Sequence, residues 1–384
     1  MKKLFAFLLA VIFSFSINAQ TTKTMMWGGV EREYIEYVPS SYQAGTPAPV
    51  LFVFHGLSDN MSNMFNGTGF KAIANAHGWI VITPQALPAT IASMSIGTAW
   101  NSGVSATLYS NTYIINEGVD DAGFAMAILD DLIQNYNIDQ SNVFCTGFSM
   151  GGFMSNRMAI EYGNRIKAIA SVSGTIGNEL ISAQNTGHVS AMHIHGTADQ
   201  MVTYANADYT IYNNFSVSIG LGAEATVDYW RNYNQCSATP THTTYPDNVN
   251  DGLTFERFLY ENGENGTKTA FIKVTGGDHD WYYTPANDID YTTEIYNFFA
   301  SCMEPVGINE PAAYSVNVYP NPTKDFVHIS GENISNIQIY NALGQLMMTT
   351  TSTDISVSDW SDGVYTINIV LTDGRLFTRK MIKK

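Results

Sequence analysis

Basic residues are scarce in this sequence. Lys and Arg number 18 in 384 residues against 34 Asp and Glu, so the formal net charge is −16 at pH 7. Proteins that bind nucleic acid hold its phosphates with clustered Lys and Arg, and we find no such basic patch. This shortage excludes nucleic acid and anionic membrane surfaces as expected partners, and it favours a neutral substrate.

Long apolar runs are absent apart from one at the start of the chain. That run, residues 4–17, is short for a membrane span; it follows Lys2 and Lys3 and precedes a small residue, Ala19, suited to cleavage after it. We expect residues 1–20 to be a signal peptide, with an uncleaved anchor as the alternative. The rest of the sequence predicts no stable membrane span.

Cysteine is equally sparse, with three residues. An odd number in an exported chain leaves room for one disulfide and one free thiol. Cys145 lies in an expected buried strand, so we expect it to be the free thiol. Cys236 and Cys302 could pair, which the sequence leaves open. The spacing of the three excludes a cysteine-rich zinc site.

Apolar residues, by contrast, make up 45% of the chain, which allows a large core and excludes general disorder. The length suggests two domains. Residues 21–303 contain unbroken apolar runs at 50–54, 80–82, 143–146, 168–172, 192–195 and 271–274. Strands of this kind are buried on both faces, which predicts a mostly parallel sheet covered by helices.

Helical periodicity separates these runs. After the acidic pair Asp120-Asp121, which suits a helix start, apolar residues recur every three or four positions at Phe124, Ile128, Leu129, Leu132 and Ile133. Alternating strands and helices predict a doubly wound α/β fold for residues 21–303.

The pattern changes after Cys302. Residues 304–315 contain Pro305, Gly307 and Pro311 and are expected to form a linker. Residues 316–384 show short runs of alternating polarity at 326–329, 337–340 and 364–370, separated by turn residues. This period predicts a small all-β sandwich as the second domain.

A G-x-S-x-G motif at residues 147–151 lies between an expected strand and an expected helix, which is the context that a nucleophilic serine requires. Its glycines permit a sharp turn that exposes Ser149 at the helix N-terminus. A serine in an ordinary glycine turn is the alternative. We predict that Ser149 is a catalytic nucleophile.

A serine hydroxyl needs a base, and His279 is the strongest candidate. It follows the expected strand 271–274 and a glycine-containing stretch, so it should lie at the carboxyl edge of the sheet, where catalytic groups gather. His193 and His195 lie inside a strand and are expected to be satisfied core residues. Their H-x-H spacing could hold a metal, but no third ligand follows nearby.

The acid should come from a strand end between Ser149 and His279, and Asp199 follows one. A turn aspartate that caps the next segment is the alternative, and Asp247 is a weaker competitor. For the oxyanion hole we expect the backbone N–H groups of Met150 and Leu57. His55, beside that second loop, should brace it without transferring protons. This chemistry needs neither a cofactor nor a metal.

Several stretches together resemble the extracellular esterases that include polyhydroxybutyrate depolymerases and feruloyl esterases. They are His55-Gly56, Trp100-Asn101, residues 119–124, residues 147–152, Tyr229-Trp230 with Cys236, and residues 276–281. The resemblance covers most of residues 25–303. It implies an α/β-hydrolase fold, catalytic Ser149, Asp199 and His279, and a neutral aryl, polysaccharide-linked or polyester substrate.

The same resemblance assigns substrate contacts to Trp281 and Trp100, with packing as the alternative for Trp281. Leu57 stands where many members of the family have cysteine, so the substrate subclass stays open. Met150 after the serine is also found in polyester hydrolases of the cutinase type, which keeps polyester cleavage among the expected activities.

The final segment resembles the sorting domain of the type IX secretion system of the Bacteroidetes. The resemblance rests on residues 318–322, 339–345 and 363–365 and on the basic end 379–384. It implies that the type IX machinery is a partner and that the protein is secreted or held at the cell surface. A sandwich that binds carbohydrate or polymer is the alternative.

Two other functions compete with the esterase. A serine peptidase of the prolyl oligopeptidase type shares His195-Gly196 followed by Asp199, but this chain lacks room for the propeller domain of those enzymes. A non-catalytic surface binding protein would not require the complete set of Ser149, Asp199 and His279.

Overall fold

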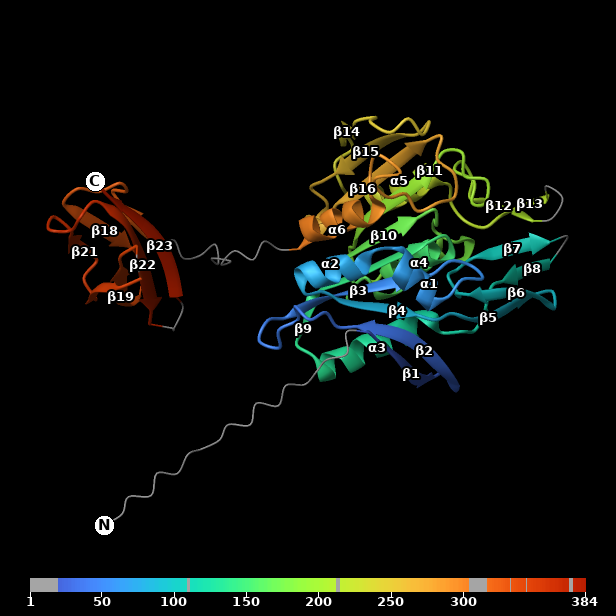
Figure 1. Ribbon diagram of the computed structural model, residues 1–384, viewed down its shortest axis with the longest axis horizontal. Helices are drawn as coiled ribbons and strands as arrows, with labels where there is room; N and C mark the ends of the chain where they lie inside the picture. The colour runs from blue at the N-terminus through green and yellow to red at the C-terminus, as the bar shows by residue number, and fades with distance from the viewer. Residues whose placement is uncertain are drawn as a thin grey trace, which may run out of the picture. The chain divides into compact units, whose positions relative to one another are not determined.

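The computed structural model describes residues 20–108, 111–211, 215–303, 316–331, 333–342, 344–372 and 376–384. Internal contacts divide the chain into two compact units, with the boundary between Met303 and Glu304 (Figure 1). The expected linker lies outside the described residues, and so does the expected signal peptide apart from Gln20.

A ten-stranded sheet runs through the first unit. Its centre is six parallel strands, in the order β4 (Ile80–Pro84), β3 (Ala48–Phe54), β9 (Ile138–Phe148), β10 (Ala168–Val172), β11 (Ser190–Gly196) and β16 (Thr269–Thr275). Each contains one of the six apolar runs, so the predicted parallel sheet is confirmed. These strands are almost wholly buried because helices cover both faces.

Antiparallel strands complete the two edges of this sheet. They are β1 (Gln20–Trp27) and β2 (Val30–Tyr37) beside β4, and β15 (Thr254–Tyr260) and β14 (Thr241–Thr244) beside β16. Strand β1 alternates between exposed and half-buried residues, as expected of an edge with one face in water.

Two apolar clusters hold the helices against the sheet. One face carries α1 (Met61–Gly67), α2 (Phe70–His77) and α6 (Tyr291–Cys302), and the other carries α3 (Asp121–Asn135), α4 (Met150–Tyr162) and α5 (Ala223–Tyr233). On the first face Phe144 stacks between Trp79 and Phe299, with ring centroids 4.9 and 4.8 Å away. Burying one such side chain contributes roughly 1.5–3 kcal/mol.

The acidic start of α3 has two roles. Asp120 caps the helix, as expected, by accepting a hydrogen bond from the Gly123 amide at 2.8 Å. Asp121 instead points inward and forms an ion pair with Arg32 of β2 at 2.6 Å, with both side chains at most 1% exposed. Its other oxygen accepts from the Asn101 amide at 2.7 Å. This pair therefore joins the sheet edge, α3 and the segment that holds Asn101.

Three β-hairpins stand apart from the main sheet on one side of the unit (Figure 1). They are β5 (Leu87–Ile91) with β6 (Met94–Ala99), β7 (Ser105–Leu108) with β8 (Asn111–Ile114), and β12 (Asp208–Ile211) with β13 (Phe215–Ser218). Strand β13 packs beside β7. The sequence patterns predicted none of these hairpins.

The second unit is a small sandwich of two antiparallel sheets, as predicted. One sheet holds β17 (Asn317–Tyr319), β18 (Phe326–Ser330) and β21 (Asp354–Ser356); the other holds β20 (Leu346–Thr350), β19 (Ile334–Tyr340), β22 (Gly363–Leu371) and β23 (Leu376–Lys383). Alternate residues such as Ile337, Ile339, Ile367 and Ile369 fill the core between the sheets.

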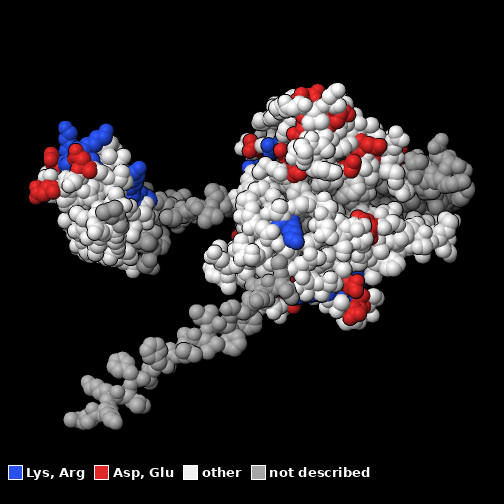
Figure 2. Space-filling view, in the orientation of Figure 1, with Lys and Arg blue, Asp and Glu red and all other residues white. Residues whose placement is uncertain are grey.

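Acidic side chains gather on the first unit. The space-filling view shows them over the β14–β15 edge of the sheet, while most of the visible face is uncharged (Figure 2). Residues 316–384 contain six Lys and Arg and six Asp and Glu, so the negative charge of the chain resides in the residues before them.

All three cysteines are unbridged, so Cys236 and Cys302 do not form the disulfide that the sequence left open. Cys145 is buried within β9, as expected, and burial raises the pKa of its thiol. Within the described ranges, no helix combines the length and the apolar character needed to cross a bilayer.

Candidate active site

Four loops converge at the carboxyl edge of the parallel strands. Leu57 follows β3, Ser149 follows β9, Asp199 follows β11 and His279 follows β16. Because the four strands run in the same direction, the residues that follow them meet at one end of the sheet. Gly56, Leu57, Ser149, Met150 and His279 line one cavity there.

Ser149 occupies a strained turn between β9 and α4. Its φ of 55° and ψ of −120° lie outside the regions that residues with a side chain prefer. Its N–H donates to the Val172 carbonyl at 2.8 Å. A Cβ on Gly147 would lie 2.3 Å from the Gly151 carbonyl oxygen, and one on Gly151 would lie 2.0 Å from that of Phe54. The two glycines are therefore required by close backbone approach.

The same turn places Ser149 at the N-terminus of α4, where the first N–H groups have no partner within the helix. The Ser149 carbonyl accepts from the amides of Gly152 and Phe153, while Met150 occupies the first helical position. Leu57 lies on the wall of the same cavity. Free N–H groups at a helix N-terminus favour a nearby negative charge.

Asp199 and His279 are joined by a hydrogen bond of 2.7 Å between Oδ2 and Nδ1. An ionised carboxylate only accepts, so Nδ1 carries the proton and Nε2 is left able to take another. The other oxygen of Asp199 accepts from the amides of Met201 and Val202, both at 2.9 Å. The side chain of Asp199 is therefore fixed on both oxygens.

The environment of Asp199 favours its charged form. Burial opposes ionisation, but hydrogen bonds from His195 and His279 and the electrostatic interaction with the two rings outweigh it and hold the pKa of Asp199 below its ordinary value. The Phe148 ring lies 4.7 Å from the His279 ring, between centroids, and supports the imidazole from one side.

The cavity beside Ser149 has a volume of about 720 Å³ and mostly apolar walls. All three hairpins contribute to it, with Ile91 and Ile96 from the first, Ala106 from the second and Val217 from the third. Asp59 and His279 are the only ionisable groups of Asp, Glu, Lys, Arg or His type among its described lining residues. The cavity is suited to an uncharged, largely apolar group.

Residues 40–218 match the family model described as phospholipase/carboxylesterase. This part of the chain is similar to that family, whose model covers somewhat less than half of the sequence. The matched range includes Ser149 and Asp199 and ends before His279, so the position of His279 beside Asp199 is established by the geometry of β11 and β16 alone.

The first unit is similar to two curated esterases. It is 25% identical over 254 residues to the bifunctional acetylxylan esterase/xylanase XynS20E of Neocallimastix patriciarum, covering 65% of this chain and 31% of that protein. It is 24% identical over 251 residues to feruloyl esterase B of Piromyces equi, covering 65% of this chain and 42% of that protein. The chain thus spans less than half the length of either relative.

Among solved structures, the chain is similar to the acetyl xylan esterase from Aspergillus awamori. That match has 15% identity and a TM-score of 0.47, and it covers 73% of this chain and 99% of the other.

Residues 317–384 match the secretion system C-terminal sorting domain, which confirms the resemblance to the type IX sorting domain. The match covers the sandwich of the second unit. It indicates export of the protein to the cell surface or the medium.

Next to the candidate site, His193 and His195 are buried core residues with satisfied ring nitrogens, as predicted. The sequence patterns did not predict that His195 also approaches Asp199: its Nε2 lies 3.3 Å from Oδ2 of that residue. The spacing of four residues between them was the available signal, but a strand pattern does not tell which way a loop folds back.

His55 braces the loop that carries Leu57. It is wholly buried, its Nδ1 donates to the Gly56 carbonyl at 2.8 Å, and its Nε2 accepts from the Ala86 amide at 3.1 Å. Burial lowers the pKa of His55, which favours this neutral form.

The expectation that Trp100 contacts the substrate is wrong, because its side chain is wholly buried. Its indole N–H donates to the His55 carbonyl at 2.8 Å, and its ring packs edge-on against Phe54 at 5.4 Å. Trp100 supports the backbone of the Leu57 loop. Its neighbour Asn101 is held by Asp121, so the buried ion pair with Arg32 also supports this loop.

Trp281 is not among the residues that line the cavity. It packs against Phe70 and Tyr291, with centroids 6.1 and 6.0 Å away, and its indole N–H donates to Thr292 at 3.3 Å. The structure thus favours the packing alternative for Trp281, and we assign a substrate contact to neither tryptophan.

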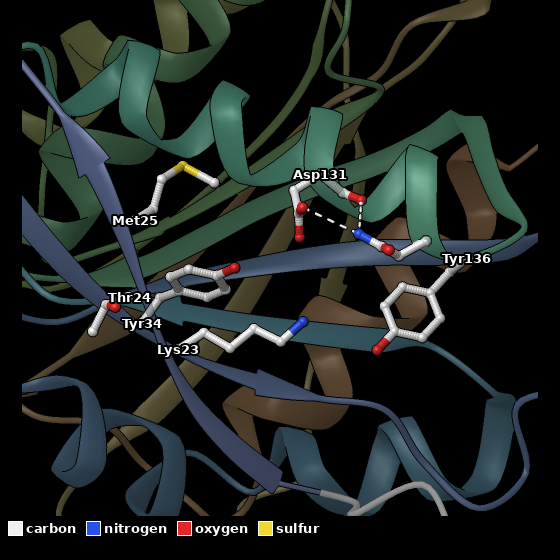
Figure 3. A pocket seen from close by; sticks show the side chains of 7 residues that line it. Lys23, Thr24, Met25, Tyr34, Asp131 and Tyr136 are labelled. Carbon is white, nitrogen blue, oxygen red and sulfur yellow. Dashed lines mark hydrogen bonds between the residues drawn. The ribbon is translucent and has the colours of Figure 1, made fainter. Parts of the chain in front are cut away.

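A second cavity, of about 530 Å³, lies between β1 and α3, away from Ser149 (Figure 3). Several of its polar groups have partners: Lys23 pairs with Glu36 at 2.8 Å, Tyr136 donates to Glu36 at 2.7 Å, and Asn135 donates to Asp131. No nucleophile and base face each other among its described lining residues. We assign it no chemistry.

Proposed function

We propose that the esterase domain hydrolyses carboxylic esters through an acyl-serine intermediate, with Ser149 as nucleophile, His279 as base and Asp199 as the acid that orients it. One observation carries this proposal. The imidazole that Asp199 holds by its Nδ1 lines the same cavity as a serine on a strained turn between strand and helix. The match to a carboxylesterase family favours this activity over the peptidase and the non-catalytic binding protein.

The proposed reaction uses these groups in sequence. His279 Nε2 takes the proton from the Ser149 hydroxyl as the oxygen attacks the ester carbonyl. The backbone N–H groups of Met150 and Leu57 stabilise the resulting oxyanion, and His279 then protonates the leaving alcohol. Water, activated by the same imidazole, releases the acid. Asp199 stays ionised and stabilises the imidazolium.

The cavity favours esters with an uncharged and largely apolar acyl or aryl group. Its volume of about 720 Å³ exceeds what a small acetyl group fills, and no Lys or Arg is present among its described lining residues to hold a carboxylate or a phosphate. Aryl esters, aryl esters on polysaccharide and polyesters all meet these requirements. Of the two similar esterases, one is named for acetylxylan esters, whose acyl group is small, and the other for feruloyl esters, whose acyl group is a larger aryl group.

The test is hydrolysis by the chain from Gln20 to Lys384, measured on nitrophenyl acetate, nitrophenyl octanoate, methyl ferulate, polyhydroxybutyrate and an aromatic polyester film. We expect turnover that is lost in Ser149→Ala and kept in Ser62→Ala, the same change on the exposed face of α1. A nitroanilide peptide should stay intact. Absence of turnover on every ester, with a folded protein, would refute the proposal.

We further propose that the type IX machinery recognises the sandwich of residues 316–384. The family match over residues 317–384 supports this. Deletion of this range should leave the esterase inside the cell envelope, which fractionation followed by an esterase assay would measure. Unchanged export of the truncated chain would contradict it.

A further inference from the structure

A row of hydrogen bonds runs through the buried sheet to the acid of the site. Ser171 Oγ lies 2.8 Å from His193 Nδ1, His193 Nε2 lies 3.0 Å from His195 Nδ1, and His195 Nε2 lies 2.8 Å from the Val202 carbonyl. The same Nε2 lies 3.3 Å from Oδ2 of Asp199. All three side chains are at most 2% exposed.

We propose that His195 is a positioning residue for Asp199, itself oriented by His193 and Ser171, so that one buried N–H fixes both the acid and the loop that follows it. This inference rests on the proposed function, since it gives Asp199 the role of the acid. Nothing in a carboxylesterase motif assigns a role to Ser171 or His193.

The acceptors fix where each proton lies. A carbonyl oxygen only accepts, so His195 Nε2 carries a proton toward Val202. With His195 neutral, its Nδ1 accepts, and the proton between the rings belongs to His193 Nε2. His193 Nδ1 then accepts from the Ser171 hydroxyl. Every donor in the row therefore points toward Asp199.

The surroundings favour this neutral arrangement. Burial, and then the neighbouring His195, keep the pKa of His193 well below its ordinary value. The groups that face His195 are His193, Asp199 and the Tyr204 ring, which meets it edge-on at 5.8 Å. Farther out, Tyr204 contacts the charged groups of Lys273 and Glu224. Phe271 stacks on His193 from β16.

The Nε2–H of His195 is shared between two acceptors, Asp199 and the Val202 carbonyl, and this explains why loss of the His195 side chain should affect catalysis. It is one of two donors to Oδ2 of Asp199, the other being His279, and it also satisfies the buried carbonyl of Val202, a residue that lines the substrate cavity. Without it, Asp199 keeps its two amide donors on Oδ1 but loses the lateral restraint on Oδ2. The imidazole of His279, which Asp199 Oδ2 holds, then loses part of the restraint on its orientation in the cavity that it shares with Ser149.

The first test compares His195→Phe with His195→Gln. Phenylalanine keeps a ring and removes both nitrogens, and we expect kcat to fall roughly 10- to 100-fold with little change in KM, since positioning errors reduce turnover by that order. The glutamine amide nitrogen can reach the place of Nε2, so His195→Gln should recover most of kcat. Ser171→Ala, at the far end of the row, should have the smallest effect.

Thermal unfolding of each variant separates positioning from folding. A lost kcat with an unchanged KM, restored by glutamine at equal unfolding temperature, is not what a merely structural histidine would give. Equal kcat in His195→Phe and wild type, or equal loss in the phenylalanine and glutamine variants, would overturn the inference.

A second test needs no activity and no variant that folds poorly. In the wild-type chain labelled with ¹⁵N-histidine, the ring nitrogens of His193 and His195 should both show a protonated Nε2 and an unprotonated Nδ1 at pH 7. Ser171→Ala should shift the His193 Nδ1 signal most. A protonated Nδ1 on either ring would refute the proposed direction of the row.

The two proposals can fail separately. If the wild type hydrolyses no ester, the proposed function fails. If it hydrolyses esters, Ser149→Ala is inactive and the His195 variants match the wild type, only the positioning role fails.

Discussion

The two walls around Ser149 are built differently. The polar side, with Asp199, His195 and His279, is formed by β11, β16 and the loops that follow them in the ten-stranded sheet. The polar contacts of these residues measure 2.7 to 3.3 Å. The apolar side comes from three hairpins that contribute no strand to that sheet. The residues that we propose for catalysis are thus held by the central sheet, while much of the apolar cavity wall is formed by hairpins outside that sheet.

This difference teaches where each kind of substitution should act. Changes on the polar side should reduce turnover or stability for every substrate. Changes on the hairpin side should alter the choice among substrates and leave the chemistry intact. The following predictions test that separation, from the largest expected effect to the smallest.

Asp199→Asn should reduce kcat by about 10⁴-fold with a small change in KM, as expected when the base loses its orienting carboxylate. The amide cannot accept from both His279 and the two backbone amides that now contact the carboxylate. Steady-state kinetics on a nitrophenyl ester would measure this. Asp228→Asn, on the exposed face of α5, is the matched control and should behave as wild type. A loss below tenfold in Asp199→Asn would contradict the assigned role.

Arg32→Met should reduce the free energy of unfolding by about 3–5 kcal/mol, because it leaves the Asp121 carboxylate buried without its partner. Urea unfolding followed by tryptophan fluorescence would measure the change. Adding Asp121→Leu should restore part of the stability, since it removes the uncompensated charge. If the single variant costs less than about 1 kcal/mol, the pair is not the support for the Asn101 segment that the structure suggests.

Ala106→Phe should shift substrate preference without abolishing turnover. The new ring projects from β7 into the cavity, so kcat/KM for nitrophenyl octanoate should fall about tenfold relative to nitrophenyl acetate, the order expected from one steric change in an apolar pocket. Thr107→Phe, the next residue on the same strand, faces solvent and serves as the control. Equal loss on both esters would show that the hairpins also position the catalytic groups.

Acid should destabilise the wild type more than Asp199→Asn. The pKa of Asp199 in the folded protein lies below its ordinary value, so this group adds stability above the ordinary aspartate pKa, and that stability is lost as the pH falls toward the folded value. Between pH 5 and pH 3 we expect the wild type to lose about 1 kcal/mol more than the variant. Parallel curves of unfolding free energy against pH would contradict this.

Much of the polar side could be predicted from sequence. Continuous apolar runs predicted the strands of the sheet, and the order of Ser149, Asp199 and His279 predicted the residues at its carboxyl edge. Both were predictable because strand burial and loop position depend on the local composition. The strands of the hairpins are four to six residues long and contain Pro88, Gly97 and polar residues. They therefore show neither the period of two residues typical of strands nor the period of three to four typical of helices.

Contacts across long separations were also invisible. Arg32 and Asp121 are 89 residues apart, and the sequence around each of them carries no signal that predicts the ion pair. Trp100 was assigned to the substrate from the resemblance to the esterases, and a resemblance of local motifs does not tell which face of a loop turns inward. His195 was correctly predicted as a core residue, yet its approach to Asp199 depends on how the loop after β11 folds back.

The independence of the hairpins from the main sheet has a consequence for how such a protein changes over generations. Selection can act on a mutation in β5, β7 or β13 through its effect on substrate choice alone, because no inactive intermediate is required. Exchange of these short hairpins can thus change which esters the cavity accepts, while the proposed catalytic residues beneath them stay the same.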